Sequence, residues 1–409
     1  MRPWGGGTPV PRAAWRVAVL AGMASYLDAG AIVTNGTVLV LYQARFGLGA
    51  RQIGELSALM TSLFAVGALL GGWLGDRFGR RCVFSTTMLG LLLGTLLLAW
   101  APGPWALYAG TAVVGLCIGA DMPVSMAMIA EEAPPGAKGR LVAFSHLLWM
   151  GGIIAVLLLQ ALLGGLGMLG GRLMWLHLSA VCLVVLVLRA RLPESRAWQA
   201  ASRSAGAPSA GQALAQLFSA PWRKSLLALA CFYALVNLAA NTSGQFKTLI
   251  FTSLGGFTVS QTGLLGLALL GVAFASTLGF MRLVDGPHRM RWFALGGVLY
   301  AGAQTLPLLL GFNGVTLVAC ALLSGVGGAV AGEPMWKIWS QELFPTMLRA
   351  TAQGLTTFVT RMVAAAAALV TPALLQAGPG YLYGSFALAI VLTTALGLAV
   401  IARLPKAAA

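Results

Sequence analysis

The sequence alternates between long apolar runs and short polar connections along almost its whole length. A helix needs about 20 apolar residues, at about 1.5 Å per residue, to cross the hydrocarbon core of a bilayer. Twelve runs satisfy this requirement: 15–41, 53–75, 82–101, 105–130, 141–163, 172–190, 223–252, 261–284, 292–311, 315–340, 350–376 and 381–402. The pattern therefore predicts an all-α membrane protein with twelve transmembrane helices.

Composition and charge agree with this interpretation. The chain is 58% hydrophobic and only 9% charged, which excludes a water-soluble globule. Its net charge of +16 lies mostly in connections on one side of the predicted membrane, and positive residues mark the cytoplasmic side. We expect a multi-pass protein of the plasma (inner) membrane, a monomer with both termini in the cytoplasm. The bilayer, and not nucleic acid, is the expected partner of the positive charge.

The chain also predicts an internal duplication. One long polar connection, 191–222, separates an N-terminal six-helix bundle, 1–190, from a C-terminal bundle, 223–409. Three markers recur at offsets of 209, 211 and 212 residues: Asp76 and Asp285, Glu131 and Glu342, Arg191 and Arg403. Nearly equal offsets indicate two pseudo-symmetric six-helix repeats, with the linker between them.

The connection between the second and third runs carries the most specific motif, G-G-W-L-G-D-R-F-G-R-R at 71–81. Its glycines allow close approach of two helix backbones, and its arginines place the hairpin in the cytoplasm. The motif resembles the corresponding loop of the major facilitator superfamily of transporters. This resemblance implies two six-helix bundles, and it implies transport of a small-molecule substrate by alternating access.

Further motifs resemble the sugar-porter branch of that superfamily: E-x-x-P-x-x-x-R at 342–349, K-G-R at 138–140 and P-E-S-R at 193–196. Charged residues that recur at the inner ends of helices in both repeats predict a charge network that closes the cytoplasmic side. A solvated, positive-inside surface is the alternative interpretation. The predicted network is Asp76, Arg77, Arg80, Arg81, Glu131, Lys138, Arg140, Glu194, Arg196, Asp285, Arg289, Glu342 and Arg349.

Asp28 and Asp121 are carboxylates inside predicted spans, where a charge costs about 2.5–3.5 kcal/mol at the helix centre on insertion scales. The resemblance implies that Asp28, midway along the first span, binds and releases a coupled proton. Alternatively, it is a structural acid bonded to Thr34, Asn35 or another helix. The arginine that partners this acid in the family is replaced here by Thr111. Asp121 is expected to be a second proton site or the partner of a neighbouring helix.

The expected solute site is assembled from four other spans. His146, eight residues after Lys138, fills the position of a family glutamine that hydrogen-bonds sugar hydroxyls, although a lone histidine often only packs. Amides of the seventh span need polar partners in the membrane, and Gly244 is expected to let that helix break. Glu333 and Lys337 are spaced to pair with each other. The expected solute contacts are His146, Asn237, Asn241, Gln245, Glu333, Trp336, Lys337, Trp339 and Arg361.

The predicted function is proton-coupled symport of a small polar solute, a sugar or an inositol-like polyol. Uptake of an organic acid or other anion is the first alternative, favoured by the cations Lys247, Lys337 and Arg361 inside spans and by the element around Asp121. Efflux of a drug or metabolite is the second, and a solute sensor without transport is a third. No nucleophile motif, phosphate loop or metal spacing occurs, so neither an enzyme nor a metal or other cofactor is predicted.

Overall fold

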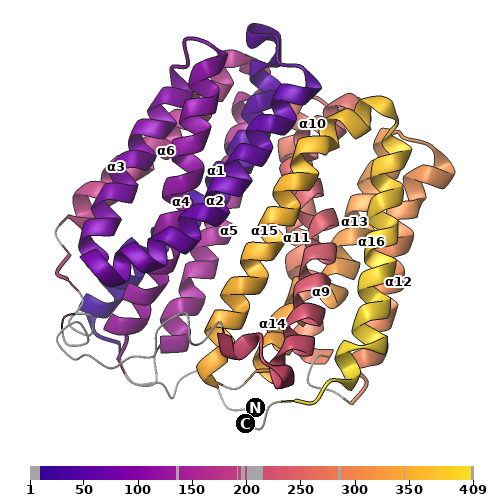
Figure 1. Ribbon diagram of the computed structural model, residues 1–409. Coiled ribbons are helices and arrows are strands. Elements are labelled where there is room, and N and C mark those ends of the chain that lie inside the picture. The colour runs from indigo at the N-terminus through magenta and orange to yellow at the C-terminus, as the bar shows by residue number, and fades with distance from the viewer. Residues whose placement is uncertain are drawn as a thin grey trace. The chain divides into compact units, whose positions relative to one another are not determined.

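The computed structural model describes residues 10–134, 138–190, 192–194, 199, 215–283, 287–344 and 346–406. These residues form α-helices and two short 3-10 helices, and no β-strand occurs among them. Twelve of the described helical segments are long and apolar enough to cross a membrane. The prediction of an all-α protein with twelve spans is therefore confirmed (Figure 1).

The chain divides into two compact units, Met1–Gly47 with Leu59–Gly206 (unit 1) and Leu48–Ala58 with Ala207–Ala409 (unit 2). Unit 1 takes its helices from the first half of the chain, apart from the first residues of α2. These helices are α1 (Arg12–Phe46), α2 (Ala50–Phe78), α3 (Arg80–Ala99), α4 (Pro104–Glu132), α5 (Lys138–Leu163) and α6 (Met168–Arg189). Most of the predicted linker, 191–222, lies outside the described residues.

Unit 2 holds the helices of the second half. They are α9 (Ala220–Gln245), α10 (Lys247–Ser253), α11 (Val259–Leu283), α12 (Arg289–Leu310), α13 (Gly314–Ala331), α14 (Glu333–Glu342), α15 (Thr346–Ala377) and α16 (Pro379–Ala399). The start of α2 packs here: Gly54 lies against the backbone of Leu369, and Gln245 Nε2 donates to the carbonyl oxygen of Ser57 at 3.2 Å. No motif in the sequence indicated this assignment.

The predicted duplication appears as a repeated pattern of helix contacts. In unit 1, α1 packs on α5 and α6, and α3 packs on α4 and α6. In unit 2, α9 packs on α15 and α16, and α12 packs on α13 and α16. Equivalent helices therefore have equivalent neighbours, as expected of two copies of one six-helix plan.

Two predicted spans of unit 2 are each divided into two helices. The run 223–252 is interrupted at Phe246, between α9 and α10, two residues beyond the glycine expected to allow a break. The run 315–340 is interrupted at Gly332, between α13 and α14. Pro334 explains the second break, because proline lacks an N–H and its ring collides with the carbonyl four residues earlier. Both breaks lie beside polar residues.

Glycines set the distance between α2 and α4 in unit 1. A Cβ at Gly71 would collide with the backbone of Ala120, and one at Gly119 would collide with the backbone of Phe64. Gly72, the neighbour of Gly71, has open space where its Cβ would lie. The close approach expected from the hairpin glycines therefore occurs at Gly71 and not at Gly72.

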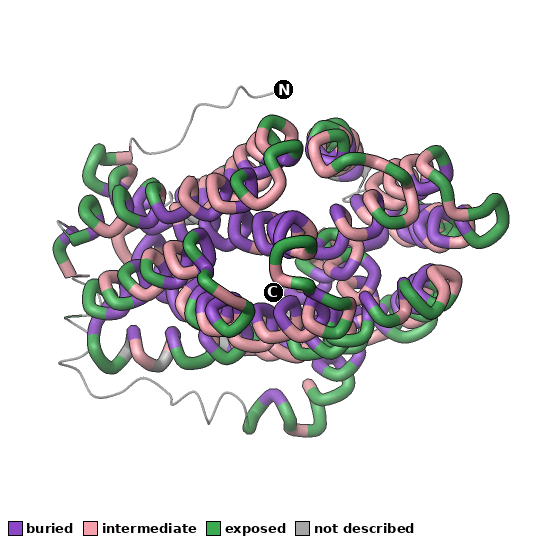
Figure 2. The backbone as a smooth tube through the Cα atoms, turned by 90° about the horizontal axis from the view of Figure 1, so that it is seen from above, coloured by how far each residue is buried: buried purple, intermediate pink, exposed green. Residues whose placement is uncertain are grey.

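Burial follows the pattern of a protein solvated by lipid tails. Buried positions run along many of the helices of both units (Figure 2), whereas large apolar side chains such as Leu162 and Val315 are exposed. An exposed leucine or valine is favourable against hydrocarbon and would be unfavourable over so large an area in water.

Candidate functional site

Unit 2 brings polar and aromatic side chains from α9, α14 and α15 together. The ring of Tyr233 stacks on Trp336 with a centroid distance of 3.9 Å and an angle of 7°. The Tyr233 hydroxyl forms a hydrogen bond with the Asn237 side chain. Glu333 and Arg361 are near enough to interact electrostatically with the same hydroxyl. We name this group the unit 2 polar cluster: Tyr233, Asn237, Glu333, Trp336, Lys337 and Arg361.

The cluster contains one exposed ion pair and one buried donor that has no acceptor among the described residues. Lys337 Nζ lies 2.9 Å from Glu333 Oε1, with the two side chains 52% and 48% exposed, so their pair is weak and readily broken. Trp336 is only 6% exposed, and its indole N–H has no acceptor among the described residues. An N–H that is buried without an acceptor is costly, so an incoming acceptor atom would be favourable here.

Other predicted solute contacts of unit 2 lie elsewhere. Trp339 is buried in an aromatic core, with its ring 4.9 Å from Phe232 and 5.2 Å from Phe293. Gln245 donates to the backbone at the start of α2. Asn241 is partly buried one turn beyond Asn237 on α9. Trp339 therefore belongs to the packed core, and the structure groups Trp336 rather than Trp339 with the charged residues.

In unit 1, Asp28 lies in the interior of the helix bundle and is 2% exposed. Asn35 and Thr111 are also buried, and neither the Asn35 amide nitrogen nor the Thr111 hydroxyl has a partner within the described part of the chain. Asp28 is therefore a buried carboxylate of a membrane-spanning helix, the environment required for the role expected of it.

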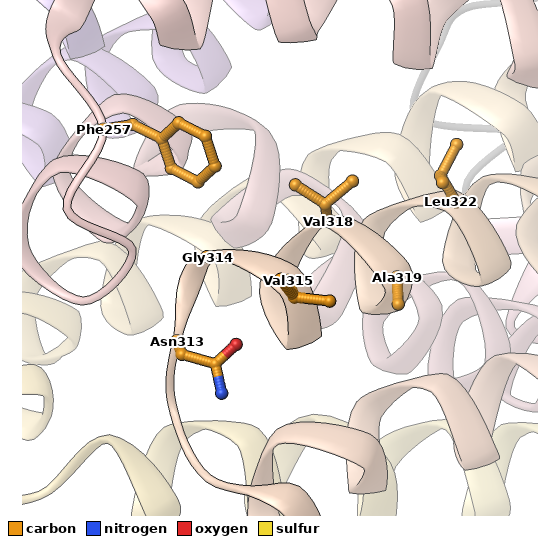
Figure 3. Close-up of a pocket in the computed structure, with 7 residues that line it drawn as sticks. All are labelled: Phe257, Asn313, Gly314, Val315, Val318, Ala319 and Leu322. Carbon is orange, nitrogen blue, oxygen red and sulfur yellow. The ribbon is translucent and has the colours of Figure 1, made fainter.

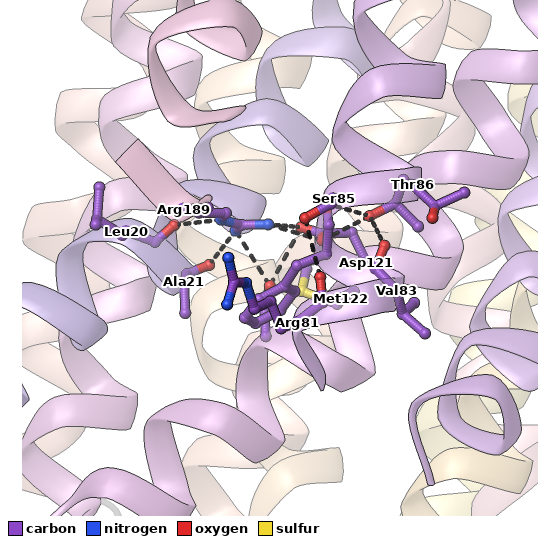
Figure 4. A network of polar contacts seen from close by, with 12 residues as sticks. Leu20, Ala21, Arg81, Val83, Ser85, Thr86, Asp121, Met122 and Arg189 are labelled. Atoms are coloured by element: carbon purple, nitrogen blue, oxygen red, sulfur yellow. Dashed lines mark hydrogen bonds and ion pairs between the residues drawn. The ribbon is translucent and has the colours of Figure 1, made fainter. Parts of the chain in front are cut away.

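Asp121 has a partner that the sequence did not predict. Arg189 Nη1 lies 2.8 Å and 3.0 Å from the two carboxylate oxygens of Asp121, and the side chains are 0% and 1% exposed. Thr87 and Ser125 also donate to the carboxylate, at 3.0 Å and 3.2 Å. Figure 4 shows this network between the helices of unit 1.

Arg189 also binds the backbone of α1. Its Nε donates to the carbonyl oxygen of Leu20 at 2.8 Å, and its Nη2 donates to that of Ala21 at 2.9 Å. The guanidinium carbon lies 4.5 Å from the centre of the Phe84 ring on α3. One arginine at the end of α6 thus connects α1, α3 and α4, and Asp121 is the acid that balances its charge.

The two histidines of unit 1 differ in their contacts. His146 is exposed, and its ring stacks on Trp149 with a centroid distance of 5.5 Å and an angle of 8°. His177, which the sequence did not place in the site, lies with Nε2 2.8 Å from the hydroxyl of Tyr26. The solute role of His146 stays a prediction.

Charged residues at the predicted cytoplasmic ends form corresponding pairs in the two repeats. Arg80 Nη2 lies 2.9 Å from Glu131 Oε1 in unit 1, and Arg289 Nη1 lies 2.7 Å from Glu342 Oε1 in unit 2. In unit 1, Glu194 accepts hydrogen bonds from the backbone N–H groups of Arg80 and Arg81 at the start of α3. A carboxylate at a helix N-terminus is stabilised by the helix dipole.

Glu342 is held by two cations, Arg289 and Lys406, the second at 3.1 Å. Burial raises the pKa of Glu342, but its hydrogen bonds to Arg289 and Lys406 and their charges outweigh burial, so the pKa lies below its ordinary value. Arg77 lies over the ring of Phe78 at 5.6 Å. The remaining members of the predicted network lie outside the described side chains: Asp76, Lys138, Arg140, Arg196, Asp285 and Arg349.

These contacts fix helix ends within each unit. Closure of the cytoplasmic side by the whole network stays a prediction.

The comparison with known families decides the assignment. A sequence model of the Major Facilitator Superfamily matches residues 18–369, most of the chain. The chain belongs to this superfamily. It is a multi-pass membrane transporter, as the resemblance of the hairpin motif implied, and not an enzyme.

Individual relatives are similar over different lengths. The minor myo-inositol transporter IolF of Bacillus subtilis (strain 168) is 34% identical over 357 residues, 84% of this chain and 80% of the relative. The niacin transporter NiaP of Acinetobacter baylyi (strain ATCC 33305 / BD413 / ADP1) is 34% identical over 132 residues, 32% of this chain and 29% of the relative. The crystal structure of a D-xylose-proton symporter matches with a TM-score of 0.79 over 96% of this chain and 98% of that chain, at 16% identity, a likeness of fold alone.

A large hollow in unit 2 is a poor candidate for the solute site of this transporter. It has a volume of about 720 Å³ and is lined by Phe257, Asn313, Gly314, Val315, Val318, Ala319 and Leu322. Figure 3 shows that apolar side chains dominate its lining. The Asn313 side chain is already used, since it accepts from the backbone N–H of Thr316 at the start of α13. The hollow therefore suits hydrocarbon and not a polar solute.

Sequence reasoning missed Tyr233 and Arg189. In the sequence, a tyrosine within an apolar helix looks the same whether it packs in the core or lines a site. An arginine at the end of a span likewise looks like one of the positive residues that mark the cytoplasmic side. The lone acid at Asp121 was the available signal, because a carboxylate inside a span requires a partner.

Proposed function

We propose that the chain is a proton-coupled symporter of a small polyhydroxylated solute, a sugar or an inositol-like polyol. The observation that carries this proposal is the Tyr233–Trp336 stack, which lies in membrane-spanning helices with Asn237 beside it. Stacked rings offer an apolar surface to C–H groups, and the indole N–H and the amide suit hydroxyls. The similarity to the minor myo-inositol transporter over most of the chain supports this solute class.

Asp28 is our candidate for the residue that carries the proton. Its carboxylate is 2% exposed in a membrane-spanning helix, where ionisable groups are rare and functional. Asp121 is the weaker candidate, because Arg189, Thr87 and Ser125 already stabilise its charged form.

We further propose that the transporter works as a monomer in the plasma membrane, surrounded by lipid, with both termini in the cytoplasm. The distribution of arginines supports this orientation. Among the predicted outer connections, the basic residues are Arg45, Arg51 and Arg172. The predicted inner connections and the termini carry most of the others.

Uptake into proteoliposomes tests the proposal. The purified protein is assayed with labelled myo-inositol, D-xylose and D-glucose, with and without a pH gradient that is acidic outside. We expect at least one of these solutes to accumulate above its external concentration, and we expect a protonophore to abolish that accumulation. Uptake of none of them, or uptake that stops at equal concentrations despite the gradient, would contradict the proposal.

A further inference from the structure

Two buried polar groups of unit 1 have hydrogen-bonding capacity that no described residue uses. Asn35 on α1 is 2% exposed, and Thr111 on α4 is 1% exposed. Neither the amide nitrogen of Asn35 nor the hydroxyl of Thr111 has a partner among the described residues. A buried polar group without a partner is costly, so two of them on adjoining helices indicate a ligand that the chain itself does not supply.

The packing of α1 on α4 places these two groups at nearly the same depth in unit 1. The two helices run in opposite directions, because successive spans of one chain cross the membrane alternately. Ser25 Oγ lies 3.9 Å from Met122 Sδ, and this contact fixes the register of α1 against α4. Asn35 is ten residues beyond Ser25, and Thr111 is eleven residues before Met122. Both therefore lie about 15–17 Å from that contact, toward the predicted outer ends of the helices.

Asp28 lies on the same face of α1 as Asn35. Seven residues separate them, which is close to two full turns, so their side chains leave the helix in nearly the same direction, about 10 Å apart along the axis. Both residues are 2% exposed, so this face is turned into the helix bundle. Ala31, which lies between them, carries only a methyl group. The two groups without partners therefore lie on the outer side of the proposed proton carrier.

Charged neighbours do not satisfy these groups. The helices that pack on α1 are α4, α5 and α6. Apart from Glu132 at the last residue of α4, their described charged and imidazole side chains already have partners: Asp121 with Arg189, Glu131 with Arg80, Arg172 with Trp100, His146 with Trp149 and His177 with Tyr26. Water has the chemistry that remains. It accepts from an amide or hydroxyl and donates to a carboxylate, and buried water binds polar groups that have no other partner.

We propose that Asn35 and Thr111 bind a short chain of water molecules through which a proton reaches Asp28 from the outer side of the membrane. This inference rests on the proposed function and adds two positioning residues to its proton pathway. The water beside Asp28 gives one proton to the carboxylate and takes one from the water on its outer side. One proton thus leaves the external solution for each carboxyl group that forms.

Two rates in proteoliposomes test this inference, measured with whichever of myo-inositol, D-xylose and D-glucose the natural protein accumulates. The first is accumulation under a pH gradient that is acidic outside, and the second is exchange of internal for external solute, which needs no net proton transfer. Asn35→Leu and Thr111→Val remove the polar atoms but keep the size of each side chain. Each should slow accumulation by about 10-fold, the effect of one lost hydrogen bond on a rate-limiting transfer, and leave exchange unchanged.

Two further measurements separate proton delivery from folding. Replacement of H2O by D2O should slow accumulation more in Asn35→Leu and Thr111→Val than in the natural protein, because proton transfer then limits the rate. Thr111→Ser keeps the hydroxyl and should retain the natural rates. Thr34→Val is the matched control, because Thr34 is also buried with an unpartnered hydroxyl among the described residues. It lies about 120° around α1 from Asp28, so Thr34→Val should leave both rates unchanged.

The outcomes distinguish this inference from the proposed function. If the natural protein accumulates a solute with protons, and Asn35→Leu and Thr111→Val match it in rate and isotope effect, the water chain is wrong and the proposed function stands. Equal slowing of accumulation and exchange in both variants would also overturn the inference, since it indicates a structural role. If the natural protein accumulates none of the three solutes, both proposals fail.

Discussion

Removal of the Arg189 guanidinium should destabilise unit 1 more than removal of any other cationic side chain that the structure describes in that unit. Arg189→Met keeps an unbranched stem about as long as the aliphatic part of arginine but removes the bonds to Asp121, Ser125 and the carbonyl oxygens of Leu20 and Ala21. Asp121 then remains as a charge inside the bundle with two hydroxyl donors and no cation.

The size of the effect follows from the burial of the pair. Loss of one partner of a buried ion pair costs about 3–5 kcal/mol, because the other charge is left unpaired. Both side chains here are at most 1% exposed, so water does not screen the remaining carboxylate. At about 2–4 °C per kcal/mol for a unit of this size, the unfolding midpoint should fall by about 6–20 °C.

Thermal unfolding in detergent, followed by scanning fluorimetry, measures this shift. Arg172→Met is the matched control on α6, since Arg172 is half-buried and stacks over Trp100 at 5.5 Å, a contact that contributes about 0.5–1 kcal/mol. The double variant Asp121→Asn, Arg189→Met should be more stable than Arg189→Met alone, because no charge is then left unpaired. A double variant whose loss equals the sum of the single losses would refute the reasoning.

Two further predictions concern packing and pH. Gly71→Ala should lower the free energy of unfolding by about 1–3 kcal/mol, because the new methyl group collides with the backbone of Ala120. Gly72→Ala is the control and should be neutral or stabilising. Equal thermal unfolding midpoints for the two variants would contradict the packing argument. The pKa of Glu342 is lower in the folded protein than its unfolded-state value of about 4.3. Its pairing with Arg289 therefore stabilises the protein fully above about pH 4.3, and this stabilisation is lost as the pH falls through the folded-state pKa. Midpoints measured between pH 6 and 3 should fall more in the natural protein than in Glu342→Gln, and parallel curves would exclude this pair as a source of acid sensitivity.

Much of the fold could be predicted from the sequence because its signals are local. The length of an apolar run determines whether a helix can span the bilayer, so the twelve spans were recognisable one at a time. The offset between Glu131 and Glu342 located the duplication, and the structure places these acids in corresponding pairs with Arg80 and Arg289. The break at Gly332 could have been predicted from Pro334, which stands two residues later in the same run.

The site was less predictable because it depends on contacts between distant segments. Asp121 and Arg189 are 68 residues apart, so no local pattern in the sequence indicated that they form a pair. Trp336 and Trp339 are indistinguishable by type and spacing, yet one stacks beside charged groups and the other packs in an aromatic core. The two residues lie on the same helix, α14, and differ only in the direction in which each side chain leaves the helix axis.

Asp28→Asn is the most direct test of proton coupling, which is central to this account. The amide keeps the size of the carboxyl group but cannot exchange a proton. In proteoliposomes, the variant should still exchange internal for external solute, but it should neither accumulate solute under a pH gradient nor alkalinise the external medium when solute is added. Accumulation by Asp28→Asn that matches the natural protein would contradict the account.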